Sequence, residues 1–178
     1  MSKLDKLRGL TDNDIGEFTL VGRKTVGKVV DVYNADTCKI IFALDSVILK
    51  FNCKLSGIEP DGIQEESKQY KVLSQKARNR LIQLSTDCDC NINAKFSSKE
   101  KKDLLDLNEK IISITCEEFD RNGKLLVHLS DINSELTYNQ ILIDEKYVKK
   151  INLNQKNRFK LNVTPSFDSD TDSSNSPN

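Results

Sequence analysis

The chain has 178 residues, 37% hydrophobic and 30% charged, which is typical of a globular domain with polar extensions. Its 27 basic and 27 acidic side chains balance, which excludes the strongly basic class of nucleic-acid-binding protein. No apolar run is long enough to cross a bilayer, and Met1–Arg8 lacks the apolar core of a signal peptide. We therefore expect an intracellular protein without a membrane partner.

The five cysteines are an odd number, which without a secretory signal favours free thiols in a reducing compartment. Three of them fall within apolar strand patterns and are expected to be small core residues: Cys38, Cys53 and Cys116.

The N-terminal segment Ser2–Leu10 carries Leu4, Leu7 and Leu10 at helical spacing. This predicts a short amphipathic arm, which either caps the domain or docks on a protein partner. The arm takes up residues 1–23, and Phe18 and Leu20 are candidates to anchor the lead-in to the first strand.

A three-strand meander follows the arm. Val26–Tyr33, Thr37–Leu44 and Val47–Leu55 are runs rich in β-branched and apolar residues, with short polar turns between them. The third run leads into Ser56–Gly62, a loop with acidic residues on both sides of a proline. We expect this loop and the acidic first turn to meet at one sheet edge, where a metal or phosphate site would lie.

Helical periodicity predicts one buried face over Lys68–Ser85, with the basic side chains on a solvated face. Residues 86–110 form an insertion, in which we predict a short strand at Asn91–Ala94 and a charged helix over Ser98–Leu107 opened by a serine cap.

A β-hairpin comes next, with strands Ile111–Phe119 and Lys124–Ser130 joined by a turn at Asp120–Gly123, since Asn-Gly readily supplies positive φ angles. Leu136–Val148 is a further amphipathic helix. Residues 152–178 are a polar C-terminal extension, whose acidic tail from about residue 165 cannot bury enough apolar surface to fold.

Three meandering strands, a helix and a hairpin follow the order of a five-stranded Greek-key barrel of the OB type. The fold class is therefore α+β, with two or three helices around the barrel. The barrel domain is expected to span residues 24–151.

Five stretches of the chain resemble, in order, the staphylococcal nuclease (thermonuclease-like) family, above all its stand-alone members in large DNA viruses. The resemblance covers about Lys24–Lys150, apart from the insertion. It implies the same barrel, and active members hydrolyse the phosphodiester bonds of DNA and RNA with calcium. The stretches are GKVVDVYNADTCKIIF, FNCKLSGIEPDG, KARNRLIQL, EFDRNGKLLVHL and NQILIDEKYV.

The resemblance assigns roles to five positions. Asp36 matches an aspartate that binds the metal, and Glu59 takes the place of the loop aspartate that also binds it. Lys54 and Lys124 stand where two arginines clamp the phosphate. Aligned without a gap, Gly62 takes the place of the glutamate that positions the attacking water, and that group is lost. With one residue deleted, Asp61 replaces the glutamate on a shorter arm.

Only one of these five positions, Asp36, keeps the family residue, and a lost clamping donor typically costs about 2–4 kcal/mol. We therefore expect a pseudoenzyme: a non-catalytic nucleic-acid-binding or structural module, with a virion role conceivable if the chain is viral. DNA or RNA contacts are expected from Lys54, Lys124, Lys71 and Arg78, and protein contacts from the arm or the tail. The alternative is a weak calcium-dependent endonuclease.

Overall fold

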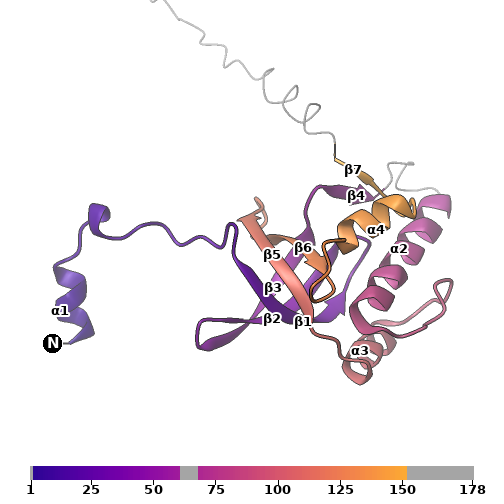
Figure 1. Ribbon diagram of the computed structural model, residues 1–178, viewed down its shortest axis with the longest axis horizontal. Helices are drawn as coiled ribbons and strands as arrows, with labels where there is room; N and C mark the ends of the chain where they lie inside the picture. Colours follow the sequence, from indigo (N-terminus) through magenta and orange to yellow (C-terminus); the bar gives the residue numbers. More distant parts are fainter. Residues whose placement is uncertain (1, 61–67, 152–178) are drawn as a thin grey trace, which may run out of the picture.

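The computed structural model describes residues 2–60 and 68–151, and its centre is a closed five-stranded β-barrel (Figure 1). The strand order is β1-β2-β3-β6-β5, with β3 and β6 parallel and the other neighbours antiparallel. This order confirms the predicted OB-type barrel and the α+β class. The barrel strands are β1 (Lys24–Val32), β2 (Thr37–Leu44), β3 (Val47–Leu55), β5 (Ile112–Phe119) and β6 (Leu125–Ser130).

Three helices cover the side of the barrel away from the β2–β3 turn, and a fourth stands apart in the N-terminal arm (Figure 1). The longest, α2, contacts β1 and the other two helices on the barrel. Within the described ranges, no helix combines the length and the apolar character needed to cross a bilayer. The helices are α1 (Lys3–Arg8), α2 (Lys68–Thr86), α3 (Ser98–Leu107) and α4 (Tyr138–Asp144).

The core fills the barrel because inward and outward side chains alternate along each strand. On β2, for example, Ile40 and Phe42 are buried, while Lys39 and Ile41 lie on the outer face. The three strand cysteines are buried free thiols, which confirms their predicted place in the core. Burial raises the pKa of the Cys53 thiol to about 12, so this thiol stays protonated at neutral pH.

Gly27 lies at the point of β1 where its pairing partner changes from β5 to β2. It pairs with Phe42 of β2 and also with Ile112 of β5. A Cβ atom at this position would lie 2.5 Å from the carbonyl oxygen of Ile41 and 2.7 Å from Cδ1 of Ile114. The closure of the barrel therefore depends on a residue without a side chain.

Two parts of the chain outside the barrel strands differ from the sequence prediction. The acidic loop after β3 contains a short strand, β4 (Ile58–Pro60), which pairs with β7 (Val148–Lys150) in a separate two-stranded sheet. The helix expected over Leu136–Val148 is shorter, because Lys146 adopts a positive φ of 61° after α4 and turns the chain into β7.

The insertion contains the predicted helix α3, but the strand predicted at Asn91–Ala94 is wrong. The backbone N–H of Ala94 donates to the carbonyl of Asn91 (3.0 Å), so this segment is a turn. The side chain of Asn91 also accepts from the N–H of Asn93 (2.9 Å), an Asx turn that competes with extended structure.

Amide side chains of α2 hold the insertion by its main chain. Gln75, Asn79 and Gln83 donate from their side chains to carbonyl oxygens between Cys90 and Ala94, at 2.7–3.1 Å.

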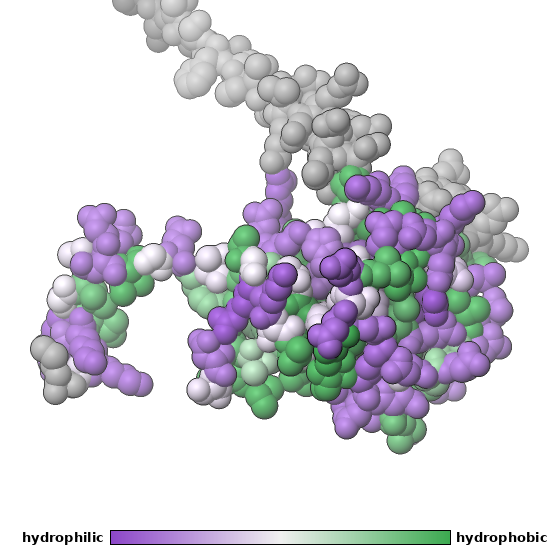
Figure 2. Space-filling model, in the orientation of Figure 1, coloured by the Kyte–Doolittle hydropathy of each residue, from purple (hydrophilic) through white to green (hydrophobic). Residues whose placement is uncertain are grey.

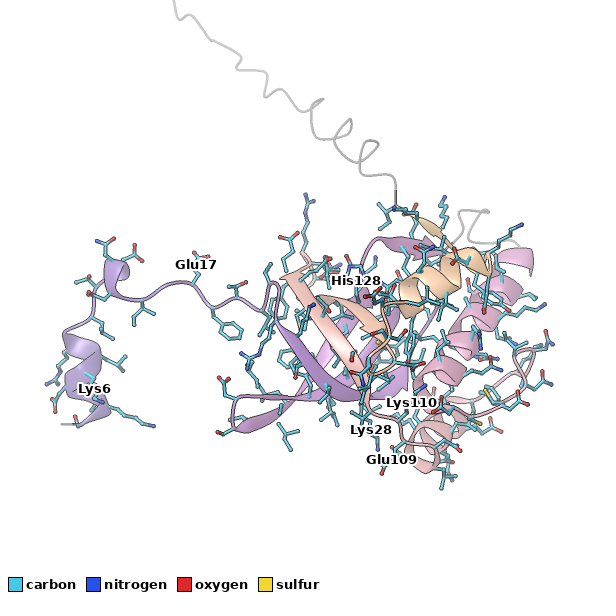
Figure 3. The ribbon with its side chains drawn as sticks, in the orientation of Figure 1. Lys6, Glu17, Lys28, Glu109, Lys110 and His128 are labelled. Carbon is cyan, nitrogen blue, oxygen red and sulfur yellow. The ribbon has the colours of Figure 1, made fainter. Side chains whose placement is uncertain are left out.

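Three lysines attach the rest of the insertion to the barrel region. The buried Nζ of Lys101 donates to the carbonyl of Val32 (2.7 Å), and burial lowers its pKa. Lys28 of β1 pairs with Glu109 at 2.9 Å, next to Lys110, which bonds to Asp87 and Asp131 (Figure 3).

The N-terminal arm forms the predicted short helix, capped by reciprocal hydrogen bonds between Ser2 and Asp5. Every described residue before Leu20 is exposed, and Lys6 and Glu17 stand away from the barrel (Figure 3). Leu20 is buried as predicted, but the prediction that Phe18 anchors the chain is wrong, because its side chain is exposed.

Candidate functional site

The turn between β1 and β2 is fixed by its own hydrogen bonds and by a bond to β3. The Oδ1 atom of Asn34 accepts from the N–H of Asp36 (3.1 Å), an Asx turn that explains the asparagine at this position. The carbonyl of Asp36 in turn accepts from the N–H of Leu55 (2.7 Å). The turn is therefore attached to the end of β3, beside Lys54.

Asp36 has partners on both carboxylate oxygens. Its Oδ1 accepts from the hydroxyl of Thr37 (2.9 Å), and its Oδ2 lies 3.5 Å from Nζ of Lys54. The Asp36 side chain is 5% exposed and that of Lys54 31% exposed, so the ion pair is partly shielded from water. Lys54 thus compensates the charge of Asp36.

Glu59 has a different partner from Asp36. It lies in β4 opposite Lys149 of β7, and its Oε1 is 3.7 Å from Nζ of that lysine. Both side chains are partly exposed, which makes this a weak surface ion pair.

The hairpin between β5 and β6 brings Lys124 into the same neighbourhood through Asp120. The Oδ1 atom of Asp120 accepts from the N–H groups of Asn122 (2.8 Å) and Lys124 (2.9 Å). Burial raises the pKa of Asp120, but these hydrogen bonds and the charges of Lys124 and Lys54 outweigh it and lower the pKa overall. Both lysines therefore lie close to one carboxylate.

The other predicted site residues lie elsewhere. Lys71 and Arg78 are on α2, which contacts β1, α3 and α4. Lys71 is exposed, whereas Arg78 bonds to the side chain of Asn79 and its charge acts on Lys101 of the insertion. Asp61 and the C-terminal extension lie outside the described residues.

The described acidic residues do not fit the calcium site that the resemblance implies. Calcium takes six to eight oxygen ligands, several of them carboxylates. Here Asp36 pairs with Lys54 and Glu59 with Lys149. Across residues 2–60 and 68–151, no three His, Cys, Asp or Glu side chains gather closely enough to hold a metal ion.

The comparisons with protein-family models, with curated proteins and with solved structures find no match. The relation to staphylococcal nuclease therefore stays a prediction from the sequence. What the structure shows is the OB-type barrel itself.

Lysines also line the outer face of β2 and β3, and only Lys54 among them was predicted from the sequence to contact nucleic acid. Lys50, Asn52 and Lys54 alternate on the outer side of β3, and Lys39 stands opposite Asn52 on β2. We call these four residues the lysine face. Neither Lys39 nor Lys50 forms a close ion pair among the described residues, but Asp31 lies opposite Lys39 on β1 and its charge contributes to the raised pKa of Lys39.

One aromatic ring contacts the lysine face, and a second is exposed at the end of β5. Nζ of Lys39 lies 5.3 Å from the ring centre of Tyr33. A side-chain hydrogen bond with Tyr33 raises the pKa of Lys39. Phe119, next to Asp120, is partly exposed as well. The signal for the lysine face was present in the sequence as a lysine-x-asparagine-x-lysine alternation within one predicted strand.

A second polar cluster lies beside Lys54 on the outer face of β3, β5 and β6. The carboxylate of Glu117 bonds to the hydroxyl of Ser56 and to Nε2 of His128. Figure 3 labels His128 on the barrel. The histidine contacts only the carboxylate and not the serine, so the arrangement lacks the base–nucleophile bond of a hydrolytic triad. Among the described residues, the imidazole of His128 therefore pairs with Glu117 and makes no bond to Ser56.

Proposed function

We propose that the chain is a non-catalytic module that binds nucleic acid on the outer face of its barrel. The observation that supports the loss of catalysis is the ion pair between Asp36 and Lys54. A metal at Asp36 would have to displace the lysine, and the described residues offer it no cluster of further carboxylates. Without a metal to polarise the phosphate and activate water, hydrolysis loses its main source of rate enhancement.

The chemistry of the lysine face supports a phosphate backbone as the ligand. Lys50 forms no ion pair among the described residues, whereas the charge of Asp31 on β1 partly compensates that of Lys39. Lys54 and Lys124 share the neighbourhood with two carboxylates, Asp36 and Asp120. Binding through a few lysines is independent of sequence and weakens steeply with salt. Exposed Tyr33 and Phe119 offer rings on which unpaired bases stack, which favours single strands over duplexes.

The double variant Lys50→Ala with Lys124→Ala tests this proposal. We expect about a tenfold loss of affinity for a labelled single-stranded oligonucleotide at low salt, measured by fluorescence anisotropy. Each phosphate contact contributes about 0.7 to the slope of log affinity against log salt for single strands, so the slope should fall by about 1.4.

Lys102→Ala is the matched control, because this lysine is exposed on α3, away from the lysine face. It should leave both the affinity and the salt slope unchanged. Equal losses in the control and the double variant, or no binding by the wild type, would reject the nucleic-acid proposal and favour a protein partner.

The alternative, a weak calcium-dependent endonuclease, predicts a different result. We expect no calcium-dependent cleavage of single-stranded DNA or RNA. The amount of intact substrate should be the same with calcium and with chelator. Cleavage that chelator abolishes and that Asp36→Ala also abolishes would establish the alternative. If the wild type is inert, Lys54→Arg with Lys124→Arg should remain inert too, because Glu59 is paired with Lys149.

A further inference from the structure

The segment that joins α2 to α3 carries two cysteines separated by a single residue. Cys88 is half-buried and Cys90 is 8% exposed, and both are free thiols. The segment runs along α2, bound to its amide side chains, and hydrophilic residues predominate over this part of the surface (Figure 2). The three cysteines of the barrel are all 0% exposed. A dissolved reagent therefore reaches Cys88 more readily than any barrel cysteine.

The two thiols lie side by side. Burial raises the pKa of the Cys90 thiol, and Cys88 raises it further, through its charge and through a side-chain hydrogen bond between the two cysteines. Cα atoms two positions apart along a chain are separated by at most about 7 Å. A disulfide joins Cα atoms about 4.4–6.8 Å apart. The pair can therefore be bridged without a rearrangement of the fold.

Hydrogen bonds to α2 hold the main chain on both sides of the pair. The N–H of Cys88 donates to Oγ1 of Thr86 (3.2 Å). The carbonyl of Cys90 accepts from Nε2 of Gln83 (2.7 Å). The two sulfur atoms are therefore presented to each other at a high effective concentration, which favours a reaction within the pair over a reaction with a second molecule.

The barrel contains a second pair of neighbouring cysteines, which provides an internal comparison. Cys38 of β2 lies directly opposite Cys53 of β3, so their Cβ atoms are close enough for the thiols to meet. Both side chains are completely buried, and burial raises the pKa of both thiols. A reagent in solution reaches neither sulfur while the barrel is folded. Access from solvent therefore distinguishes the two pairs.

We infer that Cys88 and Cys90 form a modification site, at which a small disulfide such as glutathione disulfide converts the two thiols into an intramolecular disulfide. Cys88, the more exposed residue, attacks one sulfur of the reagent as the thiolate and releases one reduced thiol. The Cys90 sulfur then attacks the Cys88 sulfur of this mixed disulfide, loses its proton and releases the second thiol. In sum, two cysteine thiols are oxidised and the reagent disulfide is reduced to two thiols. The lysine face takes no part, so the inference does not depend on nucleic-acid binding.

Equilibration of the full-length chain in glutathione buffers tests this inference. Remaining free thiols are alkylated in denaturant, and cleavage after lysine and arginine releases Cys88 and Cys90 together in peptide 81–95 and each barrel cysteine in a peptide of its own. As the proportion of glutathione disulfide rises, peptide 81–95 should escape alkylation and become two hydrogen atoms lighter than its reduced form. It should be about tenfold more oxidised than each barrel peptide. Dithiothreitol should reverse the change, and thermal unfolding confirms that the barrel stays folded.

Two serine variants test the order of the two steps. Cys90→Ser lacks the second thiol, so it should accumulate a stable mixed disulfide between Cys88 and glutathione. Cys88→Ser is the matched control, because Cys90 is buried and should be modified about tenfold less. Any of four results would overturn the inference: an unmodified peptide 81–95 in glutathione disulfide alone, equal oxidation of the barrel cysteines, a stable mixed disulfide in the wild type, or equal modification of the two variants.

Discussion

Replacement of Gly27 by alanine is expected to lower the free energy of unfolding by about 3 kcal/mol. The new Cβ would lie 2.5 Å from the carbonyl oxygen of Ile41 and 2.9 Å from Cβ of Phe42. Both atoms belong to the adjacent strand β2, which is held by β1 on one side and β3 on the other. Neither atom can move without breaking strand pairs of the barrel, because both are fixed to the backbone of β2. The steric clash therefore cannot be relieved by rotating a side chain.

Urea unfolding followed by circular dichroism measures this effect. Gly16→Ala is the control, because nothing lies within 4 Å of a Cβ at Gly16 in the arm. The control should change the free energy of unfolding by less than about 0.5 kcal/mol. Equal free energies of unfolding for Gly27→Ala and Gly16→Ala would contradict this prediction. They would show that β1 and β2 leave room for a side chain at Gly27.

Asn139→Leu is expected to lower the free energy of unfolding by about 2 kcal/mol, because it removes the side-chain donor of a buried carbonyl. The Nδ2 atom of Asn139 donates to the carbonyl of Ser56 (2.8 Å) and is 3.3 Å from that of Val127. The parallel pairing of β3 with β6 ends at Leu55, so this side chain continues the link between the two strands.

Leucine has nearly the same shape as asparagine, so the measured loss reports the hydrogen bonds rather than a cavity. Gln140→Ala is the control on the same helix. Gln140 is exposed, and its side chain bonds only to Asp144 (2.6 Å), so its loss should cost less than about 0.5 kcal/mol. Comparable losses for the two variants would mean that Asn139 contributes no more than a surface residue.

The elements that the sequence predicted best are those whose signals are local. Strands β2 and β3 and helix α3 have the predicted bounds. The two strands show apolar runs between short polar turns, and α3 starts after Ser97, whose capping box with Glu100 is visible in the sequence. By contrast, β4 and β7 are three residues long and pair across about ninety residues of chain, so no periodicity marks them.

The candidate site was predictable in its position but not in its pairing. The sequence placed Asp36 and Lys54 at neighbouring strand ends, where the structure has them. It gave no sign that Lys54 would bind Asp36, that Glu59 would pair with Lys149, or that Asp120 would lie near two lysines. Such partners are set by which strands pair and by where the turns between them lie, and residue spacing along one strand does not contain this.

The attachment of the insertion has a consequence for how its sequence can vary. Gln75, Asn79 and Gln83 recur every four residues along one side of α2, and all three bind main-chain carbonyls between Cys90 and Ala94. Every amino acid supplies the same carbonyl group. The exposed side chains of Asn93 and Lys95 are therefore free to change, and a foreign loop of equal length with the same turn can be grafted onto these three amides.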